Sequence, residues 1–448
     1  MSPDTLSNPP QTATAPRRRA DAARNDQILW DTGLELLLEK GPDRLSALDL
    51  ARSAGLTTGA VYARYENNEE ILVGLWQNRI AGPLRSYLEL AVKTMLAPPF
   101  TDVDAIKALA NIVLEPASPL RAAVSMLIAA PRIQELNEVI IPEIREWLHE
   151  FGASDDVDDL PSLRVLSAAS AAIGMIYFAA ADMLPRDDVQ RAVLATQYAN
   201  QTEGLEKDVA QFPDVEATSP FDYIVTTDDP IRDALVNAAA SVIARSGVWR
   251  ATTQRIARAA HLPSSALFAT YQNRDALFED VAIKLLEEIY KQSRYSAIHG
   301  VSVSETPSDE PAQDFDDPRL KLFRLSMISS VAQNTMGLLG SIGKSHRRLR
   351  LEFQLAAIHD DDFKREITRV DRRTIDASGV FHNAVFGFEE SLARRIARYL
   401  RLLAQGSMLL EEVSQMVDGR DIRLINARLA DYACRRAIGE IAPTAHIF

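Results

Sequence analysis

Three small residues in a row, Thr57, Thr58 and Gly59, stand where a short helix would begin in this chain. Small side chains let the end of a helix approach DNA closely. The threonine hydroxyls and the free backbone amides there can donate hydrogen bonds to phosphate oxygens or base edges. The chemistry predicted for this stretch is therefore contact with DNA.

A cluster of three arginines, Arg17 to Arg19, precedes the first predicted helix and could serve the same purpose. Basic arms of this kind can enter a minor groove or follow the phosphate backbone, although a solvated charged tail has the same composition. The net charge of -13 argues against a protein that coats nucleic acid without selection, because such coating needs clustered Lys and Arg side chains.

The elements that must position the threonines are predicted as three consecutive helices. Residues 26–40 carry apolar side chains at helical spacing, and a glycine-proline pair ends this helix. Ser46, three residues ahead of an aspartate, forms a capping box that begins the second helix, and Gly55 offers the positive φ of the following turn. The third helix is expected over residues 58–65.

This arrangement occurs twice in the chain. Residues 43–72 align without a gap with residues 249–278, each pair of positions being 206 apart, and Tyr65 for example faces Tyr271. Such a constant offset indicates one unit that is repeated. Similarity continues weakly beyond it, and it pairs Arg121 with Arg350 and Gly174 with Gly406.

The segment GLTTGAVYARYENNEEIL, residues 55–72, resembles the recognition-helix signature of the TetR family of transcriptional regulators, and the second copy matches that signature too. The resemblance implies a one-component regulator, usually a repressor, that binds double-stranded operator DNA. Together with the arginine cluster, the candidate DNA-binding residues are Arg17, Arg18, Arg19, Ser46, Thr57, Thr58, Gly59, Tyr62, Arg64 and Tyr65, and in the second copy Thr252, Ser264, Ser265, Phe268, Thr270 and Arg274.

The domain organisation follows from the repeat and the resemblance. Apolar residues recur at helical spacing and no run of alternating β-branched residues occurs, so the fold class is all-α. The expected divisions are a flexible basic arm (1–24), a first helix-turn-helix unit (25–73), a first helical regulatory domain (74–212), a linker (213–229), a second helix-turn-helix unit (230–279) and a second helical regulatory domain (280–448) with a disordered insertion at about 296–318.

The two units depart from the family pattern in different ways. The position that usually supplies a phosphate-binding lysine holds Asn68 in the first unit and Arg274 in the second. His261 replaces the turn glycine, and Phe268 lacks the hydroxyl through which Tyr62 could reach a phosphate. Either the units read different half-sites of an imperfectly palindromic operator, or the second unit no longer binds DNA. The hydroxyl and basic side chains left in the second unit favour the first interpretation.

Members of the family normally bind DNA as two-fold dimers, because two units must be held about one turn of DNA apart. Residues 161–184 and 392–413 resemble the penultimate, dimer-forming helix of the family, and small residues such as Gly174 permit close approach of helices. We expect an intramolecular four-helix interface and a monomer that acts as a pseudo-dimer. A homodimer of chains is the alternative.

The resemblance also implies a small-molecule pocket in one or both regulatory domains, whose occupant changes the spacing of the units. An apolar or amphipathic effector is expected, since few interior charges stand out. Core packing is the competing role for each candidate. The candidates are Met126, Trp147, Met175, Tyr177 and Phe178 in the first half, and Met336, Phe353, Phe381, His382 and Phe386 in the second.

Other activities find little support in the sequence. Cys434 is the only cysteine, so neither an intramolecular disulfide nor a Cys-only metal site can form, which suits a reducing cytoplasm. No phosphate-binding glycine loop or HExxH motif occurs, and the run from His359 to Asp362 fits a helix cap better than a cation site. We expect no enzyme activity, no cofactor and no metal.

A membrane partner is not expected either. The first residues lack the apolar core of a signal peptide, and charges interrupt the apolar runs before the ~20 residues that a membrane span needs. The remaining alternative to a regulator is a helical effector-binding or protein-interaction scaffold with one or both DNA-reading units inactive. The net negative charge is compatible with such a scaffold.

Overall fold

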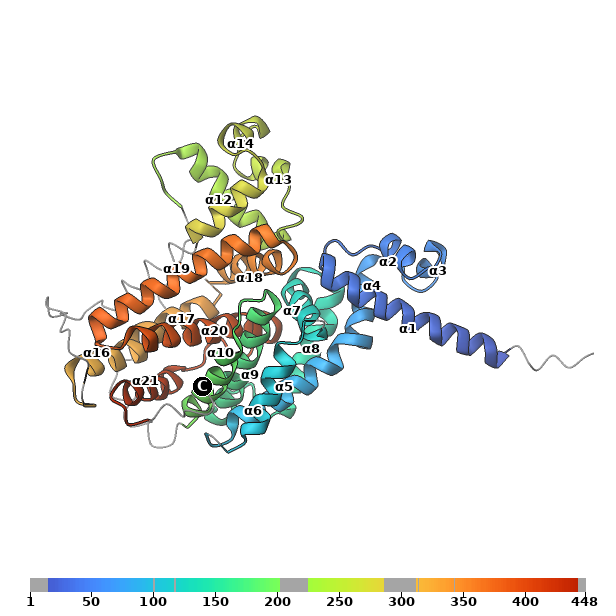
Figure 1. Cartoon of the computed structure of the whole chain (residues 1–448). Coiled ribbons are helices and arrows are strands. Elements are labelled where there is room, and N and C mark those ends of the chain that lie inside the picture. Colours follow the sequence, from blue (N-terminus) through green and yellow to red (C-terminus); the bar gives the residue numbers. More distant parts are fainter. Residues whose placement is uncertain are drawn as a thin grey trace, which may run out of the picture.

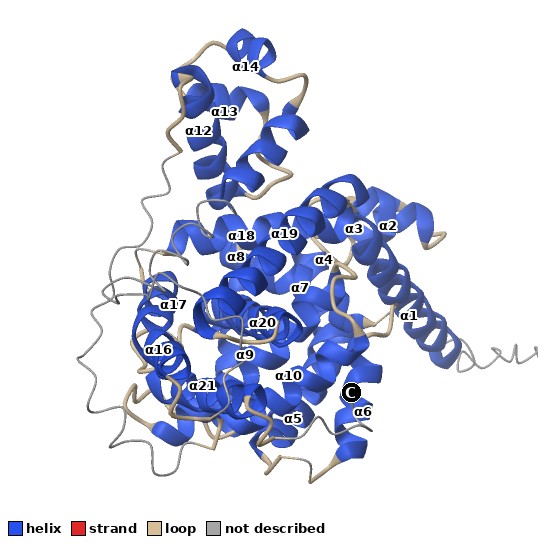
Figure 2. Cartoon of the chain, turned by 60° about the vertical axis from the view of Figure 1, so that its left-hand side comes forward, coloured by secondary structure: helices blue, strands red, loops and turns tan. Residues whose placement is uncertain are grey.

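The computed structural model describes residues 15–99, 101–116, 118–201, 225–285, 312, 314–341 and 343–441. All regular structure in these residues is helical, and no strand occurs among them (Figure 2). The all-α fold expected from the sequence is therefore confirmed. Most of the predicted linker and insertion, residues 213–224, 296–311 and 313, lies outside the described residues.

The first half forms ten α-helices and two short π or 3-10 turns among the described residues. They are α1 (Ala15–Lys40), α2 (Ala47–Ser53), α3 (Thr58–Tyr62), α4 (Asn68–Leu75), the π-helix η1 (Trp76–Ile80), α5 (Ala81–Leu96), α6 (Val103–Val113), α7 (Pro119–Ala129), the 3-10 helix η2 (Ala130–Arg132), α8 (Gln134–Glu150), α9 (Leu160–Ala180) and α10 (Arg186–Ala199).

The second half repeats this order. Its described elements are α12 (Pro230–Ser246), α13 (Thr253–Ala259), α14 (Ser264–Thr270), a helix over residues 274–285, α16 (Pro318–Ser326), the π-helix η3 (Met327–Val331), α17 (Ala332–Leu339), α18 (Lys344–His359), α19 (Asp361–Phe386), α20 (Glu390–Ser414) and α21 (Arg423–Ala437). We call residues 25–73 the first unit and residues 230–279 the second unit, and the other helices the body.

Side-chain caps and positive-φ turns fix the helix starts and ends inside both units. The Ser46 hydroxyl accepts a hydrogen bond from the Asp49 amide at 3.1 Å, and Thr252 does the same for α13. Gly55 has φ 67° and His261, at the equivalent position, has φ 57°. The predicted capping box and turn are confirmed, and His261 adopts the left-handed conformation without being a glycine.

Two helix limits differ from the sequence analysis. The first helix begins at Ala15, so that Arg17 to Arg19 belong to α1 and not to an arm ahead of it. Alanine and arginine are good helix formers, and a proline as the second helical residue suits a helix start. The third helix ends at Tyr62 and not at Tyr65.

The centre of the body is the packing of α9 against α20, with α10 lying along α21 (Figure 1). Gly174 and Gly406 meet there. A Cβ atom on Gly174 would lie 2.3 Å from the Leu402 carbonyl oxygen, and one on Gly406 would lie 1.8 Å from the Ser170 carbonyl oxygen. The two glycines that the repeat aligns therefore allow the helix backbones to touch.

Helix α9 also corrects one expectation. By length and composition it could cross a membrane, because Arg164 is the only charge that interrupts it. In the structure 94% of its apolar window is buried inside the protein, which is the environment of a core helix.

The cores of the two units differ in how they join the core of the body. The buried residues of the first unit are continuous with the main core, through contacts of α1 with α7 and of α4 with α8. The second unit has a separate core that includes Phe353 of α18 and Phe363 of α19. In Figure 1 this unit projects from the body at the labels α12 to α14.

Candidate nucleic-acid interface and internal cavity

The start of α3 is open in the first unit. Thr57 caps the helix, its hydroxyl accepting from the Ala60 amide at 3.2 Å, and a Cβ atom on Gly59 would meet only that hydroxyl oxygen, 4.0 Å away. Tyr62 exposes 53% of its surface, which is unusual for so large a ring. Thr58 is half-buried. The start of α3 therefore presents an exposed glycine and the exposed Tyr62 side chain to an approaching phosphate backbone.

Three other candidates of the first unit serve its own fold. Arg64 donates to the Ala60 carbonyl at 3.0 Å and pairs with Asp26 at 3.1 Å. The Tyr65 ring packs edge-on against Trp30 with 5.6 Å between centroids, and burial raises the pKa of its hydroxyl. The Ser46 hydroxyl is used in the cap of α2. None of these three polar groups therefore lies as a free hydrogen-bond donor on the exposed surface beside Tyr62.

The second unit presents a similar but more hydrophobic surface. Ser264 and Ser265 are exposed in the first turn of α14, and Phe268 exposes 58% of its surface at the position equivalent to Tyr62. The Thr270 hydroxyl donates back to the Ala266 carbonyl at 3.0 Å. Arg274 pairs with its neighbour Asp275 and lies over the Phe278 ring. Thr252, the cap of α13, is exposed.

One further pair of basic residues was not predicted from the sequence. Arg52 on α2 and Arg258 on α13 occupy equivalent positions of the two units, and both are exposed. The helix that precedes the recognition helix crosses the phosphate backbone in helix-turn-helix proteins. The alignment of the repeat could have identified this pair, because it places Arg52 opposite Arg258. The side chains of Arg17 to Arg19 lie outside the described residues.

The loops that follow the first helix of each unit touch one another. The Arg44 guanidinium of the first unit lies over the Trp249 ring of the second, 4.1 Å from the centroid. In return Arg250, which the repeat aligns with Arg44, pairs with Asp43 at 3.1 Å. Since Asp43 and Trp249 are also aligned positions, the contact is reciprocal, as in a two-fold symmetric interface.

Arg132 of η2 holds these loops together from the body. It donates to Asp43 at 2.5 and 2.8 Å and to Glu352 of α18 at 2.7 Å, and the Glu352 carboxylate also accepts from the Val248 amide at 3.1 Å. All three charged side chains are buried. Burial raises the pKa of the Glu352 carboxyl, and Arg132 opposes this rise. We call Asp43, Arg132, Arg250 and Glu352 the inter-unit cluster.

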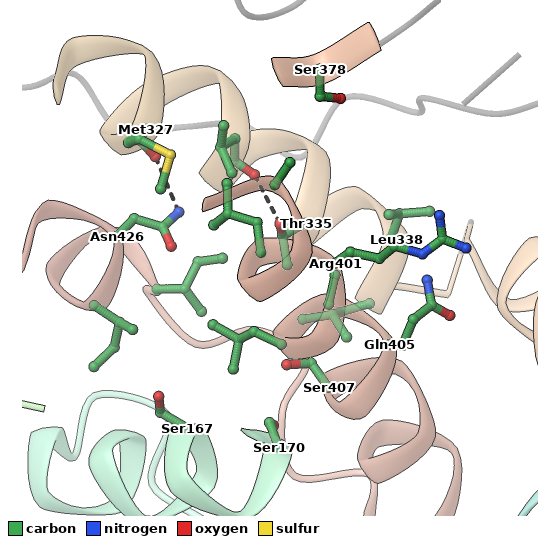
Figure 3. A pocket seen from close by; sticks show the side chains of 18 of the residues that line it. Ser167, Ser170, Met327, Thr335, Leu338, Ser378, Arg401, Gln405, Ser407 and Asn426 are labelled. Atoms are coloured by element: carbon green, nitrogen blue, oxygen red, sulfur yellow. Dashed lines mark hydrogen bonds between the residues drawn. The ribbon is translucent and has the colours of Figure 1, made fainter. Parts of the chain in front are cut away.

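The body contains a partly open cavity of about 270 Å³ between α9 and the helices of the second half. Of the candidate pocket residues, Phe381, His382 and Phe386 line it. Figure 3 shows that its polar side chains come from several helices, with Ser167 and Ser170 on α9 and Arg401, Gln405 and Ser407 on α20. A second cavity of about 180 Å³ is lined by Phe178 and shares Arg401 with the first.

The other candidate pocket residues have packing contacts. Met126 and Met175 are fully buried in the main core, and Trp147 stacks on Trp76 with 6.3 Å between centroids. The Tyr177 hydroxyl lies 3.3 Å from the Gln405 side chain. Phe353 belongs to the core of the second unit, and Met336 is half-buried on α17 without contributing to the cavity lining.

The run from His359 to Asp362 has structural roles in the described chain. Asp360 caps α19 by accepting from the amides of Asp362 and Phe363, and Asp361 pairs with Lys364. Within the described residues, no three His, Cys, Asp or Glu side chains are placed to hold a metal ion.

Comparison with known proteins agrees with the repeat. Residues 29–75 and 235–281 each match the family model described as bacterial regulatory proteins, tetR family. Both matches coincide with the helices that form the two units. A search of curated proteins finds no match to the chain.

Proposed function

The chain belongs to the TetR family of bacterial regulatory proteins and carries two TetR-like halves, and from this premise we propose that it is a ligand-responsive repressor whose two units bind one operator together. A TetR-type unit indicates a DNA-binding transcriptional regulator. In this proposal a single chain does what two identical subunits do elsewhere, and the protein works in the cytoplasm as a monomeric pseudo-dimer.

The reciprocal contact between the loops of the two units carries the proposal. Arg44 on Trp249 and Arg250 on Asp43 are paired as equivalent residues are paired across a two-fold axis. The approach of Gly174 to Gly406 follows the same rule at the centre of the body. Two such contacts support a symmetric placement of the recognition helices, which is what adjacent half-sites of DNA require.

The differences between the units support an operator that is only roughly palindromic. Tyr62 offers a hydroxyl where Phe268 offers only an apolar ring, and Gly59 is matched by Ser265. A ring without a hydroxyl favours contact with a thymine methyl group over a hydrogen bond to phosphate. The two half-sites are therefore expected to differ in sequence.

Selection of genomic fragments by the purified full chain at near-physiological salt tests the proposal. The light-scattering mass of the protein, free and on its best fragment, then gives the number of chains bound. We expect one site with two unequal halves, bound by one chain of about 50 kDa. Two chains per site would reject the single-chain pseudo-dimer, and the absence of any enriched fragment would reject DNA binding.

Substitutions in each unit distinguish the two interpretations of the repeat, in which either both units bind DNA or only the first unit does. Tyr62→Ala and Phe268→Ala alter exposed residues, so the fold is expected to survive both. If both units bind, each substitution weakens the complex and relaxes selection in a different half of the site. If only Tyr62→Ala has an effect, the second unit is a structural partner. Release or recruitment of DNA by a ligand is then measured on the same fragment.

A further inference from the structure

The 270 Å³ cavity has an unbalanced charge. Among the lining residues that the structure describes, Arg350 and Arg401 are the only ones that carry a full charge at neutral pH, and none is a carboxylate. His382, the third basic residue of the lining, is neutral there because burial lowers its pKa to about 4. The rest of the described wall is apolar, with some hydroxyl and amide side chains. The wall is thus positive at one place and uncharged elsewhere.

Arg350 differs from its neighbours in having no acidic partner in the part of the chain that the structure describes. Arg347 and Arg348 on the same helix both pair with Glu412, at 2.8 and 2.9 Å. Arg121, which the repeat aligns with Arg350, pairs with Asp182 at 3.0 Å. Within the described residues Arg350 has no carboxylate partner, and a guanidinium inside a protein without one is costly.

Gln405 is the neutral group that receives this side chain. A guanidinium can only donate, so the Gln405 amide must turn its oxygen to Arg350, and its nitrogen then donates to the Tyr177 hydroxyl at 3.3 Å. Gln405 lies four residues after Arg401, on the same face of α20 (Figure 3). Arg401 pairs with Asp371 on its other side. Of the two guanidinium groups, only that of Arg401 therefore has a carboxylate partner among the described residues.

Burial acts on both arginines, and repulsion from Arg350 acts on Arg401 as well. Burial lowers the pKa of Arg350 to about 10, and burial together with the charge of Arg350 lowers the pKa of Arg401 to about 9. Both remain protonated at neutral pH. An anion placed between them would relieve a cost that the empty protein carries, and this relief favours binding.

We propose that this cavity binds an apolar monocarboxylate, with its carboxylate on Arg350 and Arg401 and its apolar part against Leu166, Phe323 and Phe386. The proposal rests on the ligand-responsive function proposed above and gives it a ligand class. A cavity of about 270 Å³ is slightly smaller than the roughly 300–1,000 Å³ of most small-molecule sites, which favours a single small amphiphile.

The position of Arg350 also connects the cavity to both units. On the same helix α18, Glu352 binds Arg132 and the Val248 amide in the inter-unit cluster. At the end of α18 the His359 carbonyl accepts from Arg44 of the first unit at 3.3 Å. A carboxylate bound in the cavity draws Arg350 toward it and so displaces α18. Because α18 contacts both units, this displacement couples ligand binding to the position of the units.

Calorimetry and thermal shift on the full-length chain without DNA test the ligand class. The probes are decanoate, decanol and acetate at equal ionic strength. We expect decanoate to bind at least tenfold more tightly than decanol, and acetate to leave the melting temperature unchanged. Equal binding of decanol, or no binding of decanoate, overturns the proposal.

Arg350→Met is the decisive variant, because it removes the charge and keeps the length of the side chain. We expect decanoate affinity to fall at least tenfold, decanol affinity to stay the same and the melting temperature not to fall. A lower melting temperature with equal losses for both probes would assign Arg350 a purely structural role. Ser378→Leu, which narrows the cavity from α19, is expected to weaken both probes together.

Mobility shift of the selected operator fragment, with and without decanoate, is measured separately. If decanoate binds the free protein but does not change the DNA complex, the ligand site is supported and control of DNA binding by the ligand is rejected. If the protein binds DNA but not decanoate, the ligand site is rejected and the proposed DNA-binding function is unaffected.

Discussion

Gly406 of α20 lies so close to Gly174 of α9 that a Cβ atom on Gly406 would stand 2.7 Å from the Gly174 backbone nitrogen. No side chain fits between backbones at this distance. The two halves of the body can therefore pack this closely only because both aligned positions, 174 and 406, are glycine. Adding one methyl group at either position shows how much folding free energy depends on this close contact.

Gly406→Ala is expected to destabilise the fold by about 1–3 kcal/mol, because helices α9 and α20 must separate to admit the methyl group. The matched control is Gly82→Ala on α5, where a Cβ atom has no neighbour within 4 Å. There the helix gains about 0.5–1 kcal/mol from the loss of glycine. Urea unfolding followed by circular dichroism measures both changes, and effects of the same sign would contradict the packing described here.

Arg132→Met is expected to cost about 3–5 kcal/mol of folding free energy, because Asp43 and Glu352 stay buried without their shared cation. The comparison is Arg85→Met, which breaks an ion pair with Glu150 whose side chains are 47% and 45% exposed. Exposed pairs of this kind contribute about 0–1 kcal/mol. Similar losses of urea stability in the two variants would show that the inter-unit cluster does not hold the units.

Arg52→Gln and Arg258→Gln test whether both units contact DNA phosphate. If both do, each variant lowers affinity for all sequences and reduces the slope of log affinity against log salt by about one. The measurement is a salt titration of operator binding by fluorescence anisotropy. A slope that changes for Arg52→Gln alone would mean that the second unit does not contact the backbone.

The stability of the protein is expected to fall between pH 6.5 and pH 4. Burial lowers the pKa of His359 and of His382 to about 4 each, so the unfolded chain binds more protons in this window. The folding free energy linked to each buried, neutral histidine is fully present above pH 6.5 and is lost as the pH falls toward 4. At pH 5 the loss is roughly 2 kcal/mol per histidine. The raised pKa of Glu352 acts in the opposite direction.

Thermal unfolding at pH 7 and at pH 5 measures this loss. His382→Phe keeps the aromatic contacts with Phe323 and Phe386 and removes one titrating group. Its stability is expected to decline less steeply with acid than that of the unaltered chain. An identical decline in both proteins would assign the acid sensitivity to other groups.

Local features of the units were predictable because short-range rules produce them. The cap at Ser46 needs only a hydroxyl three residues ahead of a free amide, and the turn at Gly55 needs only a residue that tolerates positive φ. The constant offset of the repeat predicted the second unit, but not that His261 keeps the left-handed turn of the glycine it replaces.

Exposure and long-range pairing were not predictable in the same way. Tyr62 and Tyr65 are both tyrosines of one motif, yet Tyr62 is exposed and Tyr65 packs on Trp30. Most candidate pocket residues are in the core, because an apolar side chain fits a core and a cavity wall equally well. Arg350 was named in the alignment but not as a ligand contact, since its sequence position does not reveal which acids lie near it.

The sequence by itself determined the helical class, the two units and their family, because helical periodicity, caps and a repeated motif are written in residues close together along the chain. Only the tertiary structure decided that Asp43 meets Arg250, that Gly174 meets Gly406 and that Arg350 faces a cavity whose described lining holds no carboxylate. Such relationships depend on which distant segments pack together, and burial then sets the energy of every charge and every methyl group at the contact.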